Sequence, residues 1–121
     1  MNILVTGGNG FVGQHLMKEL AGTSHHIATI LRNEIHKWDN VQVINGSLNG
    51  IEKFQEKINQ FDPDVIIHLA WEDIPDYSAS ISRGNLNNST DLFDFIISNT
   101  NCRKILVSGS CWEYGKKQGA C

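Results

Sequence analysis

The chain has 121 residues, of which 40% are hydrophobic and 19% are charged, and its formal net charge at pH 7 is -3. This length suits one domain with a hydrophobic core of its own. The slightly acidic balance excludes the basic surface that nucleic acids and anionic membranes attract, and every apolar run is shorter than a membrane span of about 20 residues.

Strand and helix patterns alternate along the first half of the chain. The apolar run Asn2–Thr6 predicts a buried strand. Apolar side chains then recur every four residues over 12–20, which indicates an amphipathic helix, and Gly22 is placed to cap its end. The segments His26–Leu31 and Val41–Asn45 are two further strand candidates.

The next pair of elements is a helix followed by a strand. Apolar residues between Asn49 and Phe61 mark one helix face, and Asn49 with Glu52 three positions later resembles a capping box. The run Asp64–Ala70 is continuously apolar after its first residue. This pattern is typical of a strand buried on both faces of a parallel sheet.

The last elements complete the same alternation. Residues 71–83 have no clean period and are expected to form a loop, and apolar positions over 86–97 outline another helix. The short run Lys104–Ser108 is expected to be a fifth, buried strand. Strands separated by helices predict an α/β fold with a doubly wound, Rossmann-like parallel sheet of five strands and flanking helices.

A glycine-rich segment, "VTGGNGFVG", joins the first strand to the first helix. Gly7, Gly10 and Gly13 are spaced by three residues, and Gly8 begins an overlapping GxGxxG. Such glycines allow a tight turn, a close approach of backbone N–H groups to a pyrophosphate, and close packing of the helix on the sheet. Because strand, turn and helix follow in the required order, we expect a nucleotide site rather than a plain turn.

Four motifs in order resemble the NAD(P)-dependent epimerase/dehydratase family of extended short-chain dehydrogenases. They are the glycine segment Thr6–Gly13, the strand "DVIIHLA", the helix segment Asn85–Phe93 and the strand end "SGSCWEYG". The resemblance implies that residues 1–121 form the NAD(P)-binding part of a sugar-nucleotide enzyme, without its substrate domain. It also implies a homo-oligomer with a nucleotide-sugar substrate. The cofactor-binding residues expected from it are Gly7, Gly10, Phe11, Val12, Gly13, Arg32, Leu69 and Ala70.

The end of the second predicted strand bears on the choice of cofactor. In NAD-binding members an acidic residue there accepts hydrogen bonds from the adenosine ribose, but this chain has Leu31 followed by Arg32. An arginine can pair with a 2′-phosphate. We therefore favour NADP(H) over NAD(H) on this one residue, with a solvent-exposed Arg32 as the alternative. Ser47 stands where the family often has an aspartate near the adenine.

The family resemblance assigns Ser110 as the serine that hydrogen-bonds the reacting substrate oxygen. The family's acid/base pair, a tyrosine and a lysine in YxxxK, has no match, since Tyr77 is followed by Ile81 and Tyr114 by Gln118. Without a tyrosine whose pKa is lowered by that lysine, the chain lacks an acid/base. We therefore expect either the N-terminal part of a longer enzyme or a self-standing, non-catalytic NAD(P)-binding module.

Two residues after Ser110 favour an epimerase or a 4-keto-reductase over a dehydratase. Family dehydratases have Asp and Glu there, whereas this chain has Cys111 and Trp112, and an indole cannot transfer the proton. The three cysteines form no CxxC pair, which argues against a metal site and suits a reducing, cytoplasmic location. His68 lies in an apolar strand and is expected to be a hydrogen-bonded core residue rather than a catalyst.

Overall fold

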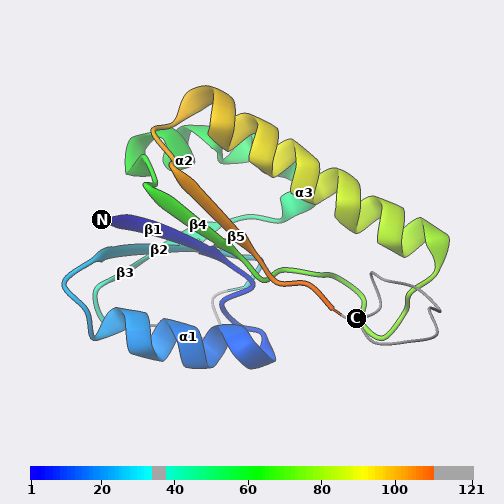
Figure 1. Ribbon diagram of the computed structural model, residues 1–121, viewed down its shortest axis with the longest axis horizontal. Helices are drawn as coiled ribbons and strands as arrows, with labels where there is room; N and C mark the ends of the chain where they lie inside the picture. Colours follow the sequence, from blue (N-terminus) through cyan, green and yellow to red (C-terminus); the bar gives the residue numbers. More distant parts are fainter. Residues whose placement is uncertain (34–37, 111–121) are drawn as a thin grey trace, which may run out of the picture.

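The structure, a computed structural model, describes residues 1–33 and 38–110. Its strands form one parallel sheet in the order β3-β2-β1-β4-β5, which confirms the predicted Rossmann-like fold. Figure 1 shows helix α1 on one face of this sheet and helices α2 and α3 on the other. The elements are β1 (Asn2–Thr6), α1 (Phe11–Ala21), β2 (His26–Leu31), β3 (Val41–Asn45), the 3-10 helix η1 (Leu48–Lys53), α2 (Gln55–Phe61), β4 (Val65–His68), α3 (Ala79–Asn99) and β5 (Lys104–Val107).

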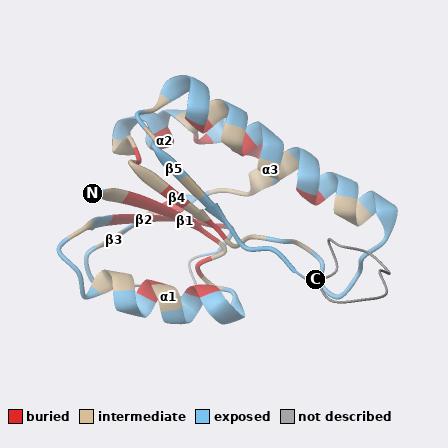
Figure 2. Ribbon diagram, viewed as in Figure 1, coloured by how far each residue is buried: buried red, intermediate tan, exposed pale blue. Residues whose placement is uncertain are grey.

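Alternate side chains of β1 build two separate cores. Ile3 and Val5 pack with Met17 of α1 on one face, whereas Leu4 packs with α2 and α3 residues such as Ile58 on the other. Because parallel strands sandwiched between helices bury both faces, every residue of β1 and β2 after the first is buried. Figure 2 shows this buried band running through the centre of the sheet.

Four details differ from the sequence-based expectations. The helix expected between Asn49 and Phe61 is two helices, because Phe54 between them has non-helical angles of φ -137° and ψ 12°. The first of them begins after Ser47, and no side chain caps it, so the capping box does not form. The loop expected over 71–83 is shorter, since α3 already begins at Ala79.

The fourth difference concerns which apolar residues are buried. On α3 the inward positions are Asn85, Leu92 and Ile96, whereas the side chains of Leu86 and Ile97 face solvent. These inward positions follow the helical repeat better than the apolar pattern does. Strand β5 was expected to be buried, but Leu106 is 47% exposed, because within the described residues β5 pairs only with β4.

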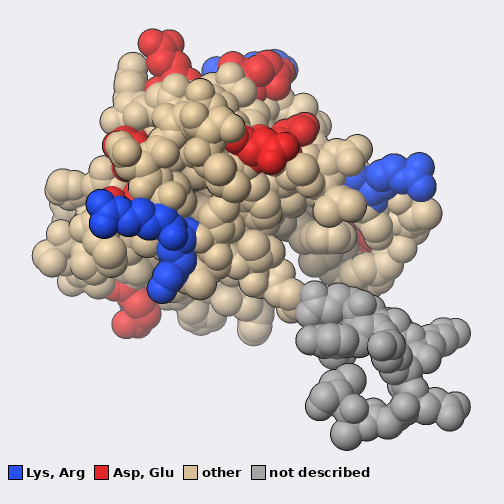
Figure 3. All heavy atoms as spheres, turned by 45° about the horizontal axis from the view of Figure 1, so that its top comes forward, with Lys and Arg blue, Asp and Glu red and all other residues tan. Residues whose placement is uncertain are grey.

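The face of the molecule shown in Figure 3 has no dominant charge. On the face shown in Figure 3, basic and acidic side chains lie scattered among uncharged residues. Among the helices that the structure describes, none is both long and apolar enough to cross a bilayer.

Candidate dinucleotide-binding site

The candidate site lies at the carboxyl ends of the strands, between β1 and β4. The chain leaves β1 toward β2 and β3 on one side of the sheet, and later returns to place β4 and β5 on the other. This change of direction opens a crevice in which doubly wound proteins bind their ligands. The glycine turn (residues 7–10) follows β1 into this crevice, and residues 69–72 enter it from β4.

Backbone contacts force glycine at two positions of this segment. Gly7 has a φ of +73°, and a Cβ there would lie 2.7 Å from the backbone nitrogen of Ala70. A Cβ on the buried Gly13 would overlap the carbonyl oxygen of Gly7 and lie 2.9 Å from Gly8 Cα. These close approaches press the start of α1 against β1 and β4.

Gly10 is different, because the protein itself leaves room there. It is the N-cap of α1 with extended angles, φ -72° and ψ 173°, and no side chain caps the helix. A Cβ on it would meet only the carbonyl oxygen of Gly7, at 3.2 Å. The start of α1 therefore presents backbone N–H groups and the positive end of the helix dipole to whatever lies above Gly10.

Two adjoining cavities open on either side of the glycine turn. The larger, of about 310 Å³, extends over the ends of β2 and β3. The smaller, of about 250 Å³, extends toward Ile74 and Ser108. Both have Gly7, Gly10, Leu69 and Trp71 in their walls. A ligand with two lobes joined by a phosphate bridge would match this arrangement, with the bridge over the glycines.

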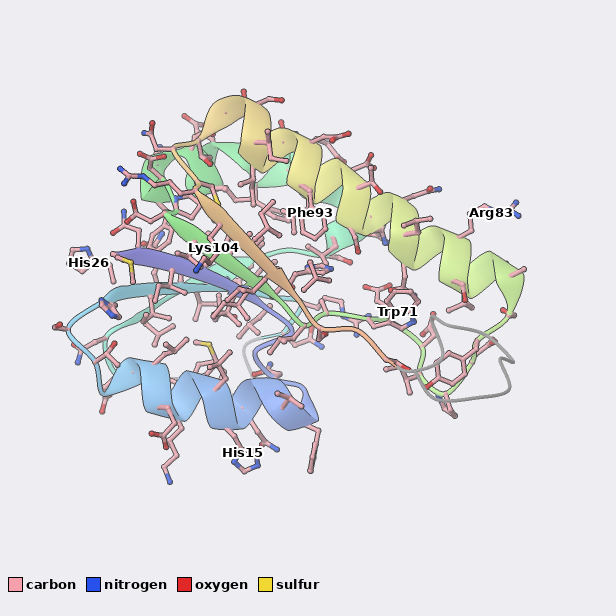
Figure 4. All side chains as sticks on the ribbon, in the orientation of Figure 1. His15, His26, Trp71, Arg83, Phe93 and Lys104 are labelled. Carbon is pink, nitrogen blue, oxygen red and sulfur yellow. The ribbon has the colours of Figure 1, made fainter. Side chains whose placement is uncertain are left out.

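Trp71 lines both cavities, whereas the sequence alone indicates only a loop residue that could contact a ligand. It follows the end of β4 and lies beneath the N-terminal half of α3, as Figure 4 shows. Asp76 and Tyr77 of the same loop are exposed and line neither cavity. Asn9 lines the larger cavity, and its buried Oδ1 atom has no hydrogen-bond partner among the described residues.

The larger cavity has an ion pair at its mouth that the sequence did not predict. Arg32 Nη1 lies 3.4 Å from Glu72 Oε1. The Ser47 hydroxyl donates to the same carboxylate oxygen over 3.5 Å. These residues follow β2, β3 and β4, so the pair exists only because the sheet brings three strand ends together.

Helix α3 fixes the position of Glu72 through the buried side chain of Asn85. The Glu72 N–H donates to Asn85 Oδ1 over 2.7 Å, and Asn85 Nδ2 donates to the Glu72 carbonyl over 3.2 Å. The same amide group also donates to the carbonyl of Ile81 over 3.1 Å. Asn85 is only 7% exposed, and its two bonds to Glu72 hold the chain after β4 against α3.

His68 is a hydrogen-bonded core residue, as expected. It is 3% exposed, and its ring lies between the hydroxyls of Thr6 and Ser89 and edge-on to the ring of Phe93. Phe93 points from α3 toward the sheet (Figure 4). Burial lowers the pKa of His68 from its ordinary value, because the charged form loses its water.

The expected site residues divide between the two cavities. Arg32 and Ala70 line the larger one, Phe11, Val12 and Gly13 line the smaller one, and Gly7, Gly10 and Leu69 line both. Val12 was counted on the buried face of α1, but it is 62% exposed and faces the smaller cavity. Ser110 is exposed and lines neither cavity, whereas Ser108 lines the smaller one. Cys111, Trp112, Tyr114 and Gln118 lie outside the described residues.

The structure offers no candidate metal site within residues 1–33 and 38–110. No three His, Cys, Asp or Glu side chains there come close enough together to hold an ion.

Residues 3–120 match the sequence model of the NAD dependent epimerase/dehydratase family, and the chain belongs to this family. An epimerase family protein of Staphylococcus aureus is 26% identical over 117 residues, which are 92% of this chain and 38% of that protein. The dTDP-6-deoxy-L-talose 4-dehydrogenase (NAD(+)) of Aggregatibacter actinomycetemcomitans is 25% identical, over 95% of this chain and 43% of the enzyme. The chain thus spans about two fifths of the length of these relatives.

The fold matches a solved structure of similar architecture. The Bordetella bronchiseptica enzyme WbmG, solved in complex with NAD and UDP, superposes with a TM-score of 0.77. The match covers 96% of this chain and 40% of WbmG at 24% identity, which shows that the two proteins share the fold.

Proposed function

We propose that this chain is the dinucleotide-binding part of an NAD(P)-dependent sugar-nucleotide epimerase or 4-keto-reductase. The observation that carries the proposal is the pair of cavities that meet over Gly7 and Gly10. The larger cavity, beside Arg32 and Glu72, suits the adenosine half of the cofactor, and the smaller cavity suits the nicotinamide half. The pyrophosphate between them would lie over the N-terminus of α1, where backbone N–H groups and the helix dipole favour negative charge.

The residues present fit such a cofactor. Among the described residues other than its chain neighbours, no side chain lies within 4 Å of the place where a Cβ on Gly10 would stand. The space above Gly10 is therefore open, and a Cβ there would occupy it. Asn9 Oδ1 is a buried acceptor without a protein partner among the described residues, as expected where a ligand completes the contacts. When bound, the nicotinamide ring supplies the hydride chemistry. The chain's own residues bind the cofactor, orient it, and shield one side of it through Trp71 and Leu69.

The name of one relative and the ligands bound in one solved structure support this assignment. One is a dehydrogenase named for NAD(+), and WbmG was solved with NAD and UDP. A UDP-sugar or dTDP-sugar is therefore the substrate class that we propose for the complete enzyme. Ser110 remains the residue proposed to contact the substrate oxygen, and homo-oligomerisation is part of the same proposal.

The sequence has no YxxxK, so we propose that these 121 residues bind the dinucleotide without turning it over. The same observation favours a second candidate, a non-catalytic NAD(P)-binding module. Assays with NADPH or NADH and a panel of UDP- and dTDP-sugars should show no hydride transfer above background. Reading the coding sequence past Cys121 separates the candidates, since an in-frame YxxxK identifies the enzyme. Clear turnover by the 121 residues alone would contradict both candidates.

Calorimetric titration with NADH and NADPH tests the binding itself. Gly10→Ala is the sharpest variant, because alanine fits the backbone angles of Gly10 and its methyl group meets only one protein atom. We expect it to fold and to bind either dinucleotide at least about ten-fold more weakly. Gly84→Ala on α3 is the matched control, since nothing lies within 4 Å of the added Cβ, and its affinity should equal that of the unmodified chain. A folded chain that binds neither dinucleotide would refute the proposal.

A further inference from the structure

Glu72 brings a carboxylate to the place where the second strand lacks one. Its Oε1 atom lies 3.4 Å from Arg32 Nη1, directly after Leu31, and accepts a bond from Ser47 over 3.5 Å. The side chain of Arg32 is 64% exposed and that of Glu72 only 26%. Arg32 therefore meets the larger cavity with its positive charge already partnered by an anion.

The backbone of Glu72 is held in place by the fold. Asn85 clamps both backbone polar groups of Glu72, and this amide is itself buried against α3. Moving Glu72 away from Arg32 by a backbone shift would break both of these bonds. The fold thus fixes the backbone from which the carboxylate extends, and Arg32 and Ser47 hold the carboxylate itself.

We propose that Glu72 determines the cofactor preference, selecting an adenosine ribose with a free 2′-hydroxyl over one that carries a 2′-phosphate. This inference rests on the proposed function and deepens it. A phosphate paired with the Arg32 guanidinium would lie within a few ångströms of the Glu72 carboxylate, and the two like charges repel. A ribose hydroxyl can instead donate a hydrogen bond to that carboxylate. The side chain of Leu31 has no acceptor for such a bond.

The inference reverses the preference expected from Leu31 and Arg32 alone. An arginine that is free to pair would favour NADP(H), but an arginine engaged by a fixed carboxylate does not offer the same charge. The preference therefore depends on a residue 40 positions away in the sequence, which the order of the strands brings to Arg32.

A double-mutant cycle tests the inference. The unmodified chain, Glu72→Gln, Arg32→Met and the double variant are each titrated with NADH and NADPH by calorimetry. We expect the unmodified chain to bind NADH more tightly. Glu72→Gln keeps the side-chain shape and removes the charge, so it should shift the affinity ratio toward NADPH about ten-fold, the effect of roughly one charge-assisted bond. In the Arg32→Met background the same substitution should produce a smaller shift, because the carboxylate is still removed but no guanidinium is freed to pair with the 2′-phosphate.

Glu19→Gln is the matched control, because it removes the same charge from an exposed position near the end of α1. Its affinity ratio should equal that of the unmodified chain, and circular dichroism should show all variants folded. A ratio in Glu72→Gln that matches the control overturns the inference and leaves the proposed function intact. Failure of the folded, unmodified chain to bind either ligand refutes the proposed function and the inference together.

Discussion

His68 Nδ1 lies 2.8 Å from Thr6 Oγ1, which joins the ends of β4 and β1 beneath the glycine turn. The direction of this bond follows from its neighbours. Ser89 donates its hydroxyl proton to the carbonyl of Asn85 over 2.8 Å, so His68 Nε2 must donate to Ser89. Nδ1 of the neutral ring then accepts from Thr6, whose oxygen accepts in turn from the Ala70 N–H.

Because the folded protein holds His68 neutral, its stability should depend on pH. Burial lowers the pKa of His68 in the folded state, so below about pH 6.5 the unfolded chain binds a proton that the folded chain refuses. The free energy of unfolding should therefore fall as the pH drops below that value, by at most about 1.4 kcal/mol per pH unit, and level off below the folded-state pKa. Urea denaturation at a series of pH values measures this slope.

His68→Leu isolates the contribution of this one side chain. The variant should be less stable at neutral pH, because Thr6 and Ser89 lose their partner. The difference in the free energy of unfolding between His68→Leu and the unmodified protein should become smaller as the pH falls. Parallel curves for the two proteins would show that His68 does not resist protonation.

Gly13→Ala should destabilise the fold strongly. The added methyl group would overlap the carbonyl oxygen of Gly7, and backbone on both sides prevents an easy shift. We expect a loss of about 2 kcal/mol or more in the free energy of unfolding, measured by chemical denaturation. A loss no larger than that of Gly10→Ala would show that α1 can move away from the turn.

Gly84→Ala should have the opposite effect. Gly84 is exposed within α3, and a Cβ there meets no atom within 4 Å. Alanine restricts the unfolded chain and favours the helix, so the free energy of unfolding should rise by about 0.5–1 kcal/mol. Thermal denaturation followed by circular dichroism measures the change, and a lower midpoint would contradict the helix assignment at this position.

Asn85→Ala should weaken both the fold and the site. It leaves the backbone N–H and carbonyl of Glu72 without their partner, at a cost of about 1–3 kcal/mol. Dinucleotide affinity should fall as well, because the residues after β4 line both cavities. Asn87→Ala, at an exposed position of the same helix, is the control and should change neither quantity. Equal effects of the two substitutions would contradict the clamp.

The exposed edge of the sheet predicts self-association. Leu106 and Val107 of β5 are 47% and 58% exposed, and within the described residues this strand has one neighbour. Unpaired apolar edges recruit other strands. Sedimentation velocity should show association that increases with concentration, and Leu106→Lys should reduce it. A strictly monomeric species at high concentration would count against an open edge at β5.

The strands were predicted more accurately than the helices, for a physical reason. A strand such as Asn2–Thr6 is apolar because both of its faces are buried, and this pattern is visible in the sequence alone. The break between η1 and α2 depends on the backbone angles of Phe54, and the buried face of α3 includes the polar Asn85. Neither the helix break nor the buried Asn85 is visible in the spacing of apolar residues, which is the signal on which the sequence analysis relied.

The glycine residues of the site were predictable because they are neighbours in the sequence. The Arg32–Glu72 pair was not, since it joins the ends of β2 and β4, and its geometry depends on the order of the strands. Arg32 was therefore interpreted from the sequence without its partner, Glu72. Spacing identifies local motifs, whereas contacts between loops require the sheet.

The central place of β1 has a consequence for the synthesis of the protein. It leaves the ribosome before the other four strands of this sheet, yet it ends between β2 and β4, with Ile3 beside Ile27 on one side and Val65 on the other. Until β4 has emerged, one hydrogen-bonding edge of β1 has no native partner. During that interval the nascent chain exposes the apolar side chains of β1, so chaperones that shield such segments are most needed before residues 65–68 have emerged.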